Sequence, residues 1–78
     1  MKELEHAQQV LSRHGDDLLA VPGVEGVWVG LDREGGVCIR VGTSRPPDRI
    51  RPPLPDELEG VPVVVEYVGP IRAEKGPG

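Results

Sequence analysis

The sequence predicts an α+β fold, a two-layer sandwich in which one main N-terminal helix packs on a three-stranded, mainly antiparallel sheet. Two observations carry this prediction. Apolar residues recur at helical spacing near the N-terminus and then alternate or run together over three short segments, and clusters of glycine and proline separate these segments. The predicted order is helix, strand, strand, short helical turn, strand.

The helical spacing extends over residues 2–19, where apolar residues share one face and polar residues fill the opposite arc. Gly15 lowers helix propensity by about 1 kcal/mol relative to alanine, so we expect the helix to break there and to restart at Asp16, whose carboxylate caps a second short turn. Pro22 and Gly23 then end the helix.

Two strands follow, joined by a turn at residues 32–36 whose glycines supply the positive φ that a hairpin needs. Alternate residues share one face, which we expect to pack on the helix. These are Val27, Val29 and Leu31 in the first strand and Val37, Ile39 and Val41 in the second. If Leu31 lies opposite Val37, the same register places Trp28 opposite Arg40 on the outer face.

The segment of residues 44–55 contains five prolines, so we expect a stiff extended loop rather than a long crossover helix. Residues 55–60 are expected to form one helical turn ended by Gly60. Residues 61–68 are apolar at nearly every position, which favours a central or doubly covered third strand. We expect residues 1–73 to form a single domain and residues 74–78 a flexible tail.

Composition excludes several function classes. The chain has 78 residues, 37% of them hydrophobic, and a net charge of -4, which fits one small domain that buries about 60% of its surface. Basic residues predominate only in residues 37–54, so we expect no nucleic-acid partner. The single cysteine excludes an internal disulfide and every multi-cysteine metal site.

The first residues contain no signal-peptide core, and no stretch approaches the roughly 20 apolar residues that cross a bilayer. We therefore expect a cytoplasmic protein without a membrane partner. Nine prolines, the excess of arginine over lysine and the lack of asparagine favour adaptation to heat or a G·C-rich genome.

Three segments resemble the small domain found ahead of bacterial trypsin-like serine proteases. They are residues 21–30 (VPGVEGVWVG), 54–65 (LPDELEGVPVVV) and 68–73 (VGPIRA). The resemblance implies a role beside a separate protease, as a pro-segment-like chaperone or inhibitor. No catalytic residue is carried over, because the sequence has no Gly-Asp-Ser-Gly segment and its only serines are Ser12 and Ser44.

The chain also resembles ferredoxin-like heavy-metal-associated domains, in which a helix likewise leads into a glycine-valine strand and a hairpin. Those domains bind metal through a cysteine pair ahead of the helix, which this chain lacks. His6 and His14 are eight residues apart, whereas two metal ligands on a helix need a spacing of three or four. We expect solvated or capping histidines, no metal site and no cofactor.

The candidate interaction residues lie on the predicted outer face. Trp28 is the only tryptophan, and an exposed ring beside Arg40 is typical of an interface hot spot or of a platform that stacks a small molecule. Packing of Trp28 on Arg40 alone, or cover by the C-terminal tail, would explain the same pattern without a function. Cys38 shares this face, and we interpret it as a half-buried, inert thiol because no histidine is placed to activate it.

The proline-rich loop offers a second, weaker candidate. Arg45, Arg49 and Arg51 could hold a phosphate or carboxylate, or could be solvated charges that balance the acidic helix. Residues 49–55 also match the R-x-x-P-x-x-P pattern that SH3-type grooves bind, although stiffening by proline explains the same residues.

No paired acid and base and no glycine-rich phosphate loop emerge, so we expect a protein that is not an enzyme. The leading hypothesis is a non-catalytic interaction module that self-associates through the outer sheet face or an edge strand, because so small a core gains stability from oligomerisation. The alternatives are the protease chaperone or inhibitor and a small-anion binder at the arginine loop. The expected partner is a second copy or another protein.

Overall fold

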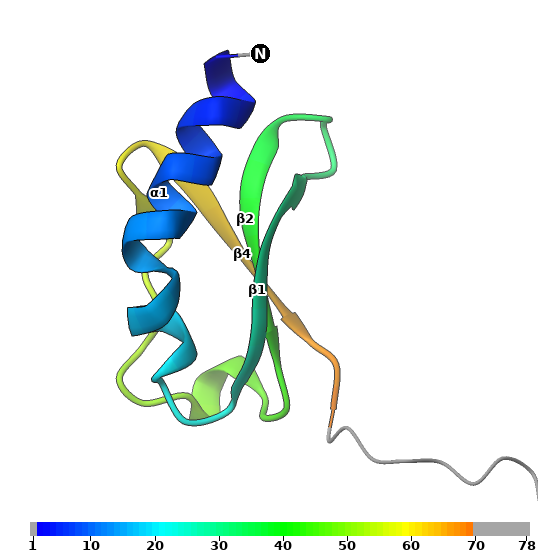
Figure 1. Ribbon diagram of the computed structural model, residues 1–78. Coiled ribbons are helices and arrows are strands. Elements are labelled where there is room, and N and C mark those ends of the chain that lie inside the picture. The colour runs from blue at the N-terminus through cyan, green and yellow to red at the C-terminus, as the bar shows by residue number, and fades with distance from the viewer. Residues whose placement is uncertain (1, 70–78) are drawn as a thin grey trace, which may run out of the picture.

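A computed structural model describes residues 2–69 and shows one helix packed on a four-stranded mixed sheet (Figure 1). The predicted α+β class is confirmed. The elements in chain order are the helix α1 (Lys2–Leu19), the strands β1 (Val24–Leu31) and β2 (Val37–Thr43), the 3-10 helix η1 (Pro47–Arg49), and the strands β3 (Glu57–Leu58) and β4 (Val61–Tyr67). Neighbouring strands follow the order β1-β2-β4-β3.

Helix α1 is continuous, so the predicted break at Gly15, with a new start at Asp16, is wrong. Gly15 is buried, and a Cβ atom placed on it would lie 3.5 Å from the Leu11 side chain and 3.8 Å from Val27 on β1. The helix therefore passes close to β1 at this point. Packing of its apolar face on the sheet outweighs the propensity cost of one glycine.

Strands β1 and β2 pair in the predicted antiparallel register, with Trp28 opposite Arg40. Asp32 organises the turn between them, because its Oδ1 atom accepts hydrogen bonds from the backbone amides of Glu34 at 2.9 Å and Gly36 at 2.8 Å. Such a side-chain bond fixes the turn geometry and with it the register. The register in turn decides which residues reach the outer face.

Strand β4 lies between β2 and β3, which agrees with its predicted central position, but it runs parallel to β2. The predicted sheet was mainly antiparallel, so this pairing is a correction. The extended loop after β2 explains it. A proline-stiffened chain rises about 3 Å per residue, so residues 44–55 can return along the full length of a strand before β4 begins.

Ile50 anchors this loop beneath one end of the sheet. Its side chain is buried, and its Cδ1 atom lies only 2.7 Å from the place that a Cβ atom on Gly23 would occupy. Gly23 also has a φ of 98°, a conformation that side chains disfavour. The turn before β1 therefore requires glycine for two independent reasons.

The residues predicted to form a helical turn include strand β3 instead. Leu58 pairs with Val61, and the two residues between them form a tight turn in which Glu59 has a φ of 50° and Gly60 a φ of 84°. Two positive φ values in a row are what a two-residue type I′ hairpin requires. A glycine that ends a helix has the same conformation, which is why the sequence was open to the other interpretation.

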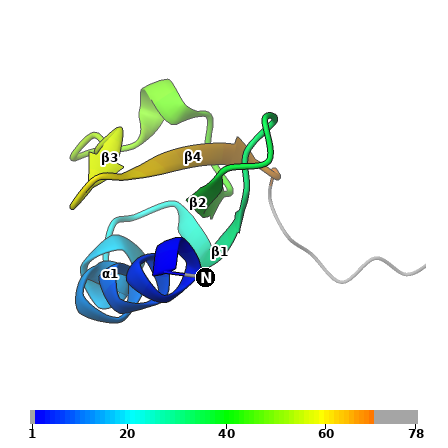
Figure 2. The same ribbon diagram turned by 90° about the horizontal axis from the view of Figure 1, so that it is seen from above.

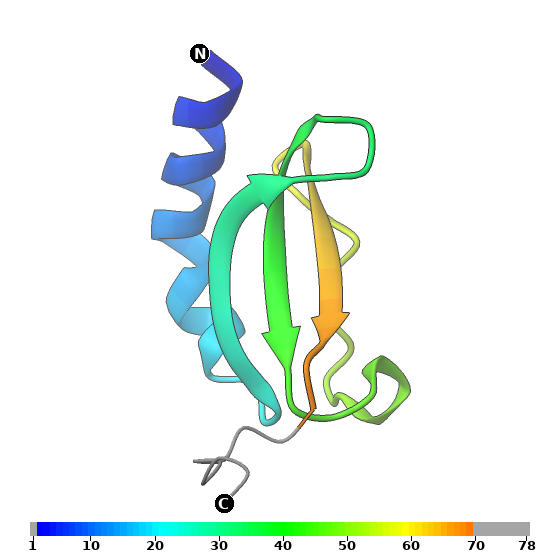
Figure 3. The ribbon, with the colours of Figure 1, turned by 90° about the vertical axis from the view of Figure 1, so that its right-hand side faces the viewer.

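Helix α1 covers only one face of the sheet (Figure 2). The buried core between the two layers consists of Ala7, Val10, Leu18, Val24, Ile39, Val41 and Val61. Figure 3 shows the opposite face of β1, β2 and β4, which no element of residues 2–69 crosses. None of the helices described is both long enough and apolar enough to cross a membrane. The predicted tail, residues 74–78, lies outside the described residues.

We predict that Gly15→Ala stabilises the protein. The added methyl group would make ordinary van der Waals contacts with Leu11 and Val27, while alanine is favoured over glycine in a helix by about 1 kcal/mol. The melting temperature should rise by about 4–8 °C. A fall in melting temperature would show that α1 and β1 are too close at this point for any side chain.

Candidate functional site

The sheet face that α1 leaves open is the candidate site, and we call it the outer face. The strand register places on it every second residue of three strands. They include Gly26, Trp28 and Gly30 from β1, Arg40 and Gly42 from β2, and Val64 and Glu66 from β4, and Val68 lies beside Gly42 just beyond β4. The absence of side chains at the three glycines makes this surface low and flat.

The indole ring of Trp28 lies across two of these glycines. A Cβ atom on Gly42 would lie 3.1 Å from the ring, and one on Gly26 would lie 3.6 Å from it. The ring can therefore lie along the sheet rather than stand away from it. Its exposed fraction is nonetheless 39%, so an apolar surface faces solvent, as the sequence predicts.

Arg40 crosses the same face and is held by hydrogen bonds at two points. Its Nη2 atom donates to Oε1 of Glu66 at 2.7 Å, and its Nη1 atom donates to the carbonyl oxygen of Leu31 at 3.0 Å. Its Cδ atom lies over Gly30, only 2.6 Å from where a Cβ atom would be. The hydrogen bond to Glu66 raises the pKa of Arg40, against the opposing effect of burial.

The face therefore carries one positive and one negative group in direct contact. Both remain accessible, because the Arg40 side chain is 28% exposed and the Glu66 side chain is 42% exposed. An ion pair at this depth neutralises the face without removing its charges from solvent. The outer face is thus a neutral, mainly apolar surface around Trp28, with the Arg40–Glu66 ion pair beside the ring.

Cys38 does not contribute to this surface. It lies opposite Gly30 in the register, as predicted, but it is fully buried rather than half-buried. The side chain of Arg40 crosses Gly30, the residue opposite Cys38, and shields this part of the sheet from solvent. Cys38 is therefore excluded as an interaction residue of the outer face.

The three loop arginines are not brought together by any contact described for residues 2–69. Arg45 and Arg49 are exposed, and the Cδ atom of Arg45 lies over Gly23. Arg51 donates through Nη1 to the carbonyl oxygens of Asp48 at 2.9 Å and Ile50 at 3.0 Å. The hydrogen bonds of Arg51 thus serve to shape its own loop, and the predicted anion site stays a prediction.

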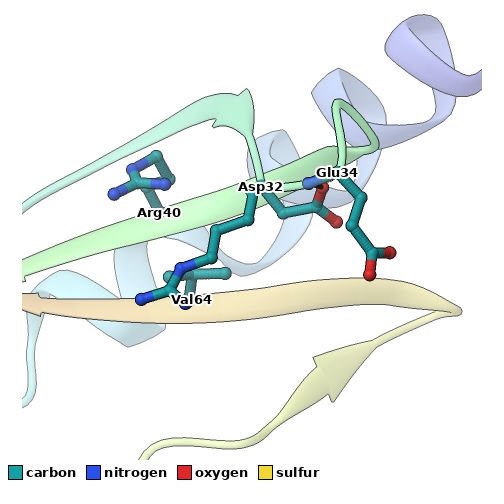
Figure 4. A pocket seen from close by; sticks show the side chains of 5 residues that line it. Asp32, Glu34, Arg40 and Val64 are labelled. Atoms are coloured by element: carbon teal, nitrogen blue, oxygen red, sulfur yellow. Dashed lines mark hydrogen bonds between the residues drawn. The ribbon is translucent and has the colours of Figure 1, made fainter.

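A hollow of about 440 Å³ opens beside the outer face at the β1–β2 turn (Figure 4). It is lined by Asp32, Arg33, Glu34, Arg40 and Val64. Figure 4 shows Glu34 reaching from the turn toward β4, with Arg40 on the other side. Two basic and two acidic residues balance each other here, so the hollow has no net charge that would select an anion or a cation.

A second polar cluster, which the sequence analysis did not predict, joins the β3–β4 turn to helix α1. The carboxylate of Glu59 accepts hydrogen bonds from Nη1 of Arg13 at 2.6 Å and from Nε2 of His14 at 2.9 Å, and its carbonyl oxygen accepts one from Nε2 of His6 at 2.8 Å. Because these oxygens can only accept, both histidines carry a proton on Nε2. We call this cluster the Glu59 clasp.

The Glu59 clasp changes the interpretation of both histidines, which were expected to be solvated or to cap a helix. They bind a turn that is distant in sequence. Helical spacing does place His6, Arg13 and His14 on one side of α1, but only the β3–β4 hairpin brings Glu59 to them. Across residues 2–69, no three histidine, cysteine or acidic side chains gather as a metal ion would need.

No family model matches this chain, and neither a curated protein nor a solved structure is detectably similar to it. The resemblances to the protease-associated domain and to heavy-metal-associated domains therefore stay predictions.

We predict that the Glu59 clasp makes stability sensitive to acid. The hydrogen bonds from His14 and Arg13 lower the pKa of Glu59. The stability that ionised Glu59 contributes is therefore complete above the pKa of a glutamate in the unfolded chain, about 4.3. It is lost as the pH falls through the lower pKa of Glu59 in the folded protein. Between pH 5 and pH 3, about one unit either side of the unfolded pKa, the free energy of unfolding should fall more steeply for the wild type than for Glu59→Gln.

The measurement is denaturant unfolding at a series of pH values. Glu57→Gln is the matched control, because Glu57 is an exposed carboxylate on the same hairpin and should leave the wild-type slope intact. Parallel profiles for wild type and Glu59→Gln would show that ionisation of Glu59 contributes nothing to stability.

Proposed function

We propose that this protein is a non-catalytic interaction module that self-associates through its outer face. The observation that carries the proposal is the exposed indole of Trp28, held flat on a sheet face that no element of residues 2–69 covers. Exposed aromatic surface of this kind is enriched at interface hot spots.

The shape of the outer face supports close approach of a second sheet. Two sheets pack face to face at about 10 Å, which leaves little room for long side chains that stand upright. Here Gly26, Gly30 and Gly42 supply none, and Trp28 and Arg40 lie along the surface. A second copy would meet a low surface on which Trp28 lies beside one ion pair, that of Arg40 and Glu66.

The small size of the core also supports self-association. One helix on one sheet gives a thin core, and small domains with thin cores commonly gain stability by burying a second surface in an oligomer. The outer face is an exposed apolar surface that is available for this. A homodimer would convert two open two-layer domains into one closed assembly.

The outer face is a better candidate than the edge of β1. Strand β3 has only two residues, so the described sheet has two open edges, that of β1 and that of β4 beyond Val63. Helix α1 packs on β1 and lies beside its free edge (Figure 3). A second β1 strand approaching that edge would meet the helix, whereas no element of residues 2–69 stands in front of the outer face.

The test is the solution mass by light scattering at several protein concentrations, for wild type and Trp28→Ala side by side. We expect the wild type to form a dimer or larger assembly as concentration rises. Trp28→Ala should weaken this association at least about tenfold, because truncating a central interface aromatic typically costs more than 1.4 kcal/mol.

Leu19→Ala is the matched control, since Leu19 is a similarly exposed apolar residue at the end of α1 and should leave the mass unchanged. Val68→Asp provides an independent variant that places a charge at the rim of the outer face without removing the ring. A monomeric wild type at every concentration, or equal loss in the Leu19 variant, would contradict the proposal.

A further inference from the structure

We infer that two copies meet face to face about a two-fold axis, with Arg40 of each copy lying over Glu66 of the other. This inference rests on the proposed function and gives it an orientation. The partner is a second copy of this chain, and the charges of Arg40 and Glu66 determine how the two copies align. The interface would hold four charges in alternating sign at its centre.

Symmetry supplies the first step of the argument. In a two-fold homodimer the same patch is used twice, so if residue i contacts residue j, residue j of the first copy contacts residue i of the second. Arg40 and Glu66 sit side by side on the outer face, 2.7 Å apart. A two-fold axis that lies in the interface and passes between them, at right angles to the line joining them, brings each group onto its opposite, whereas an axis along that line brings like charges together.

The remaining hydrogen-bonding capacity of both groups supplies the second step. A guanidinium group has five N–H donors, and the contacts described for Arg40 use one on each Nη atom. A carboxylate has two acceptor oxygens, and the described bond to Glu66 uses Oε1. Each group can therefore engage a second partner without giving up the first.

The size of the face sets the expected strength. Strand spacing and rise give the outer face of three strands a footprint of roughly 300 Å² per copy, whereas stable interfaces bury about 800 Å² per partner. We therefore expect a weak, reversible dimer. In such an interface, charge alignment determines orientation and partner choice more than affinity.

The experiment reverses one charge in each of two variants, Arg40→Glu and Glu66→Arg. The first variant has two acidic groups on its outer face and the second has two basic groups, so each should remain monomeric at concentrations where the wild type associates. An equimolar mixture should associate again, as a one-to-one heterodimer, because each face then meets its opposite. Sedimentation velocity with one variant labelled measures this directly.

Two controls accompany the mixture. Arg49→Glu and Glu57→Arg reverse exposed charges away from the outer face, and each should associate as the wild type does. Raising the salt concentration should weaken the heterodimer more than the wild-type dimer, because its attraction depends on net charge. Circular dichroism checks that each variant is folded; if a reversal unfolds the chain, Glu66→Gln replaces it and should weaken association while reducing its salt dependence.

The outcomes separate this inference from the proposed function. If the wild type associates and Trp28→Ala prevents it, but the mixture stays monomeric or the single reversals still associate, the two-fold pairing of Arg40 and Glu66 is overturned and the proposed function stands. If the wild type never associates, both are overturned together.

Discussion

A single helix can cover only one face of a sheet, and most features of this molecule follow from that limit. Helix α1 packs on β1 and β2, and the anchor residue Ile50 secures the proline-rich loop beneath one end of the sheet. Nothing in residues 2–69 is left for the outer face. The surface of that face is therefore formed by its own residues. The Trp28 ring and the Arg40 side chain lie over glycines, and Arg40 pairs with Glu66.

The Glu59 clasp adds polar contacts to the apolar packing of the β3–β4 hairpin. Leu58 and Val61 of this hairpin pack with the core, whereas the turn residues Glu59 and Gly60 are exposed. Polar contacts connect this turn to the helix, through Glu59 on one side and Arg13, His6 and His14 on the other. These contacts also hold Glu59 in a positive φ that its side chain disfavours. Acid would thus loosen the hairpin before the apolar core.

Local patterns in the sequence predicted the local parts of the structure. The sequence spacing of apolar residues predicted the register of β1 with β2 and the position of Trp28, because successive side chains on a strand point to opposite faces of the sheet. The direction of β4 depends instead on how far residues 44–55 carry the chain, and the contacts of Glu59 depend on a hairpin that only the folded sheet positions. Gly60 fits a helix end and a hairpin turn equally well, since both need positive φ. The full burial of Cys38 depends on the path that the Arg40 side chain takes across Gly30, which only the folded sheet determines.

The most direct test of the outer face uses the fluorescence of Trp28, because the chain contains no other tryptophan. Emission should shift to shorter wavelength as protein concentration rises, over the same range in which the mass increases, because association removes the ring from water. An emission maximum that stays constant while the mass increases would contradict the account, since the chain would then associate through a different surface.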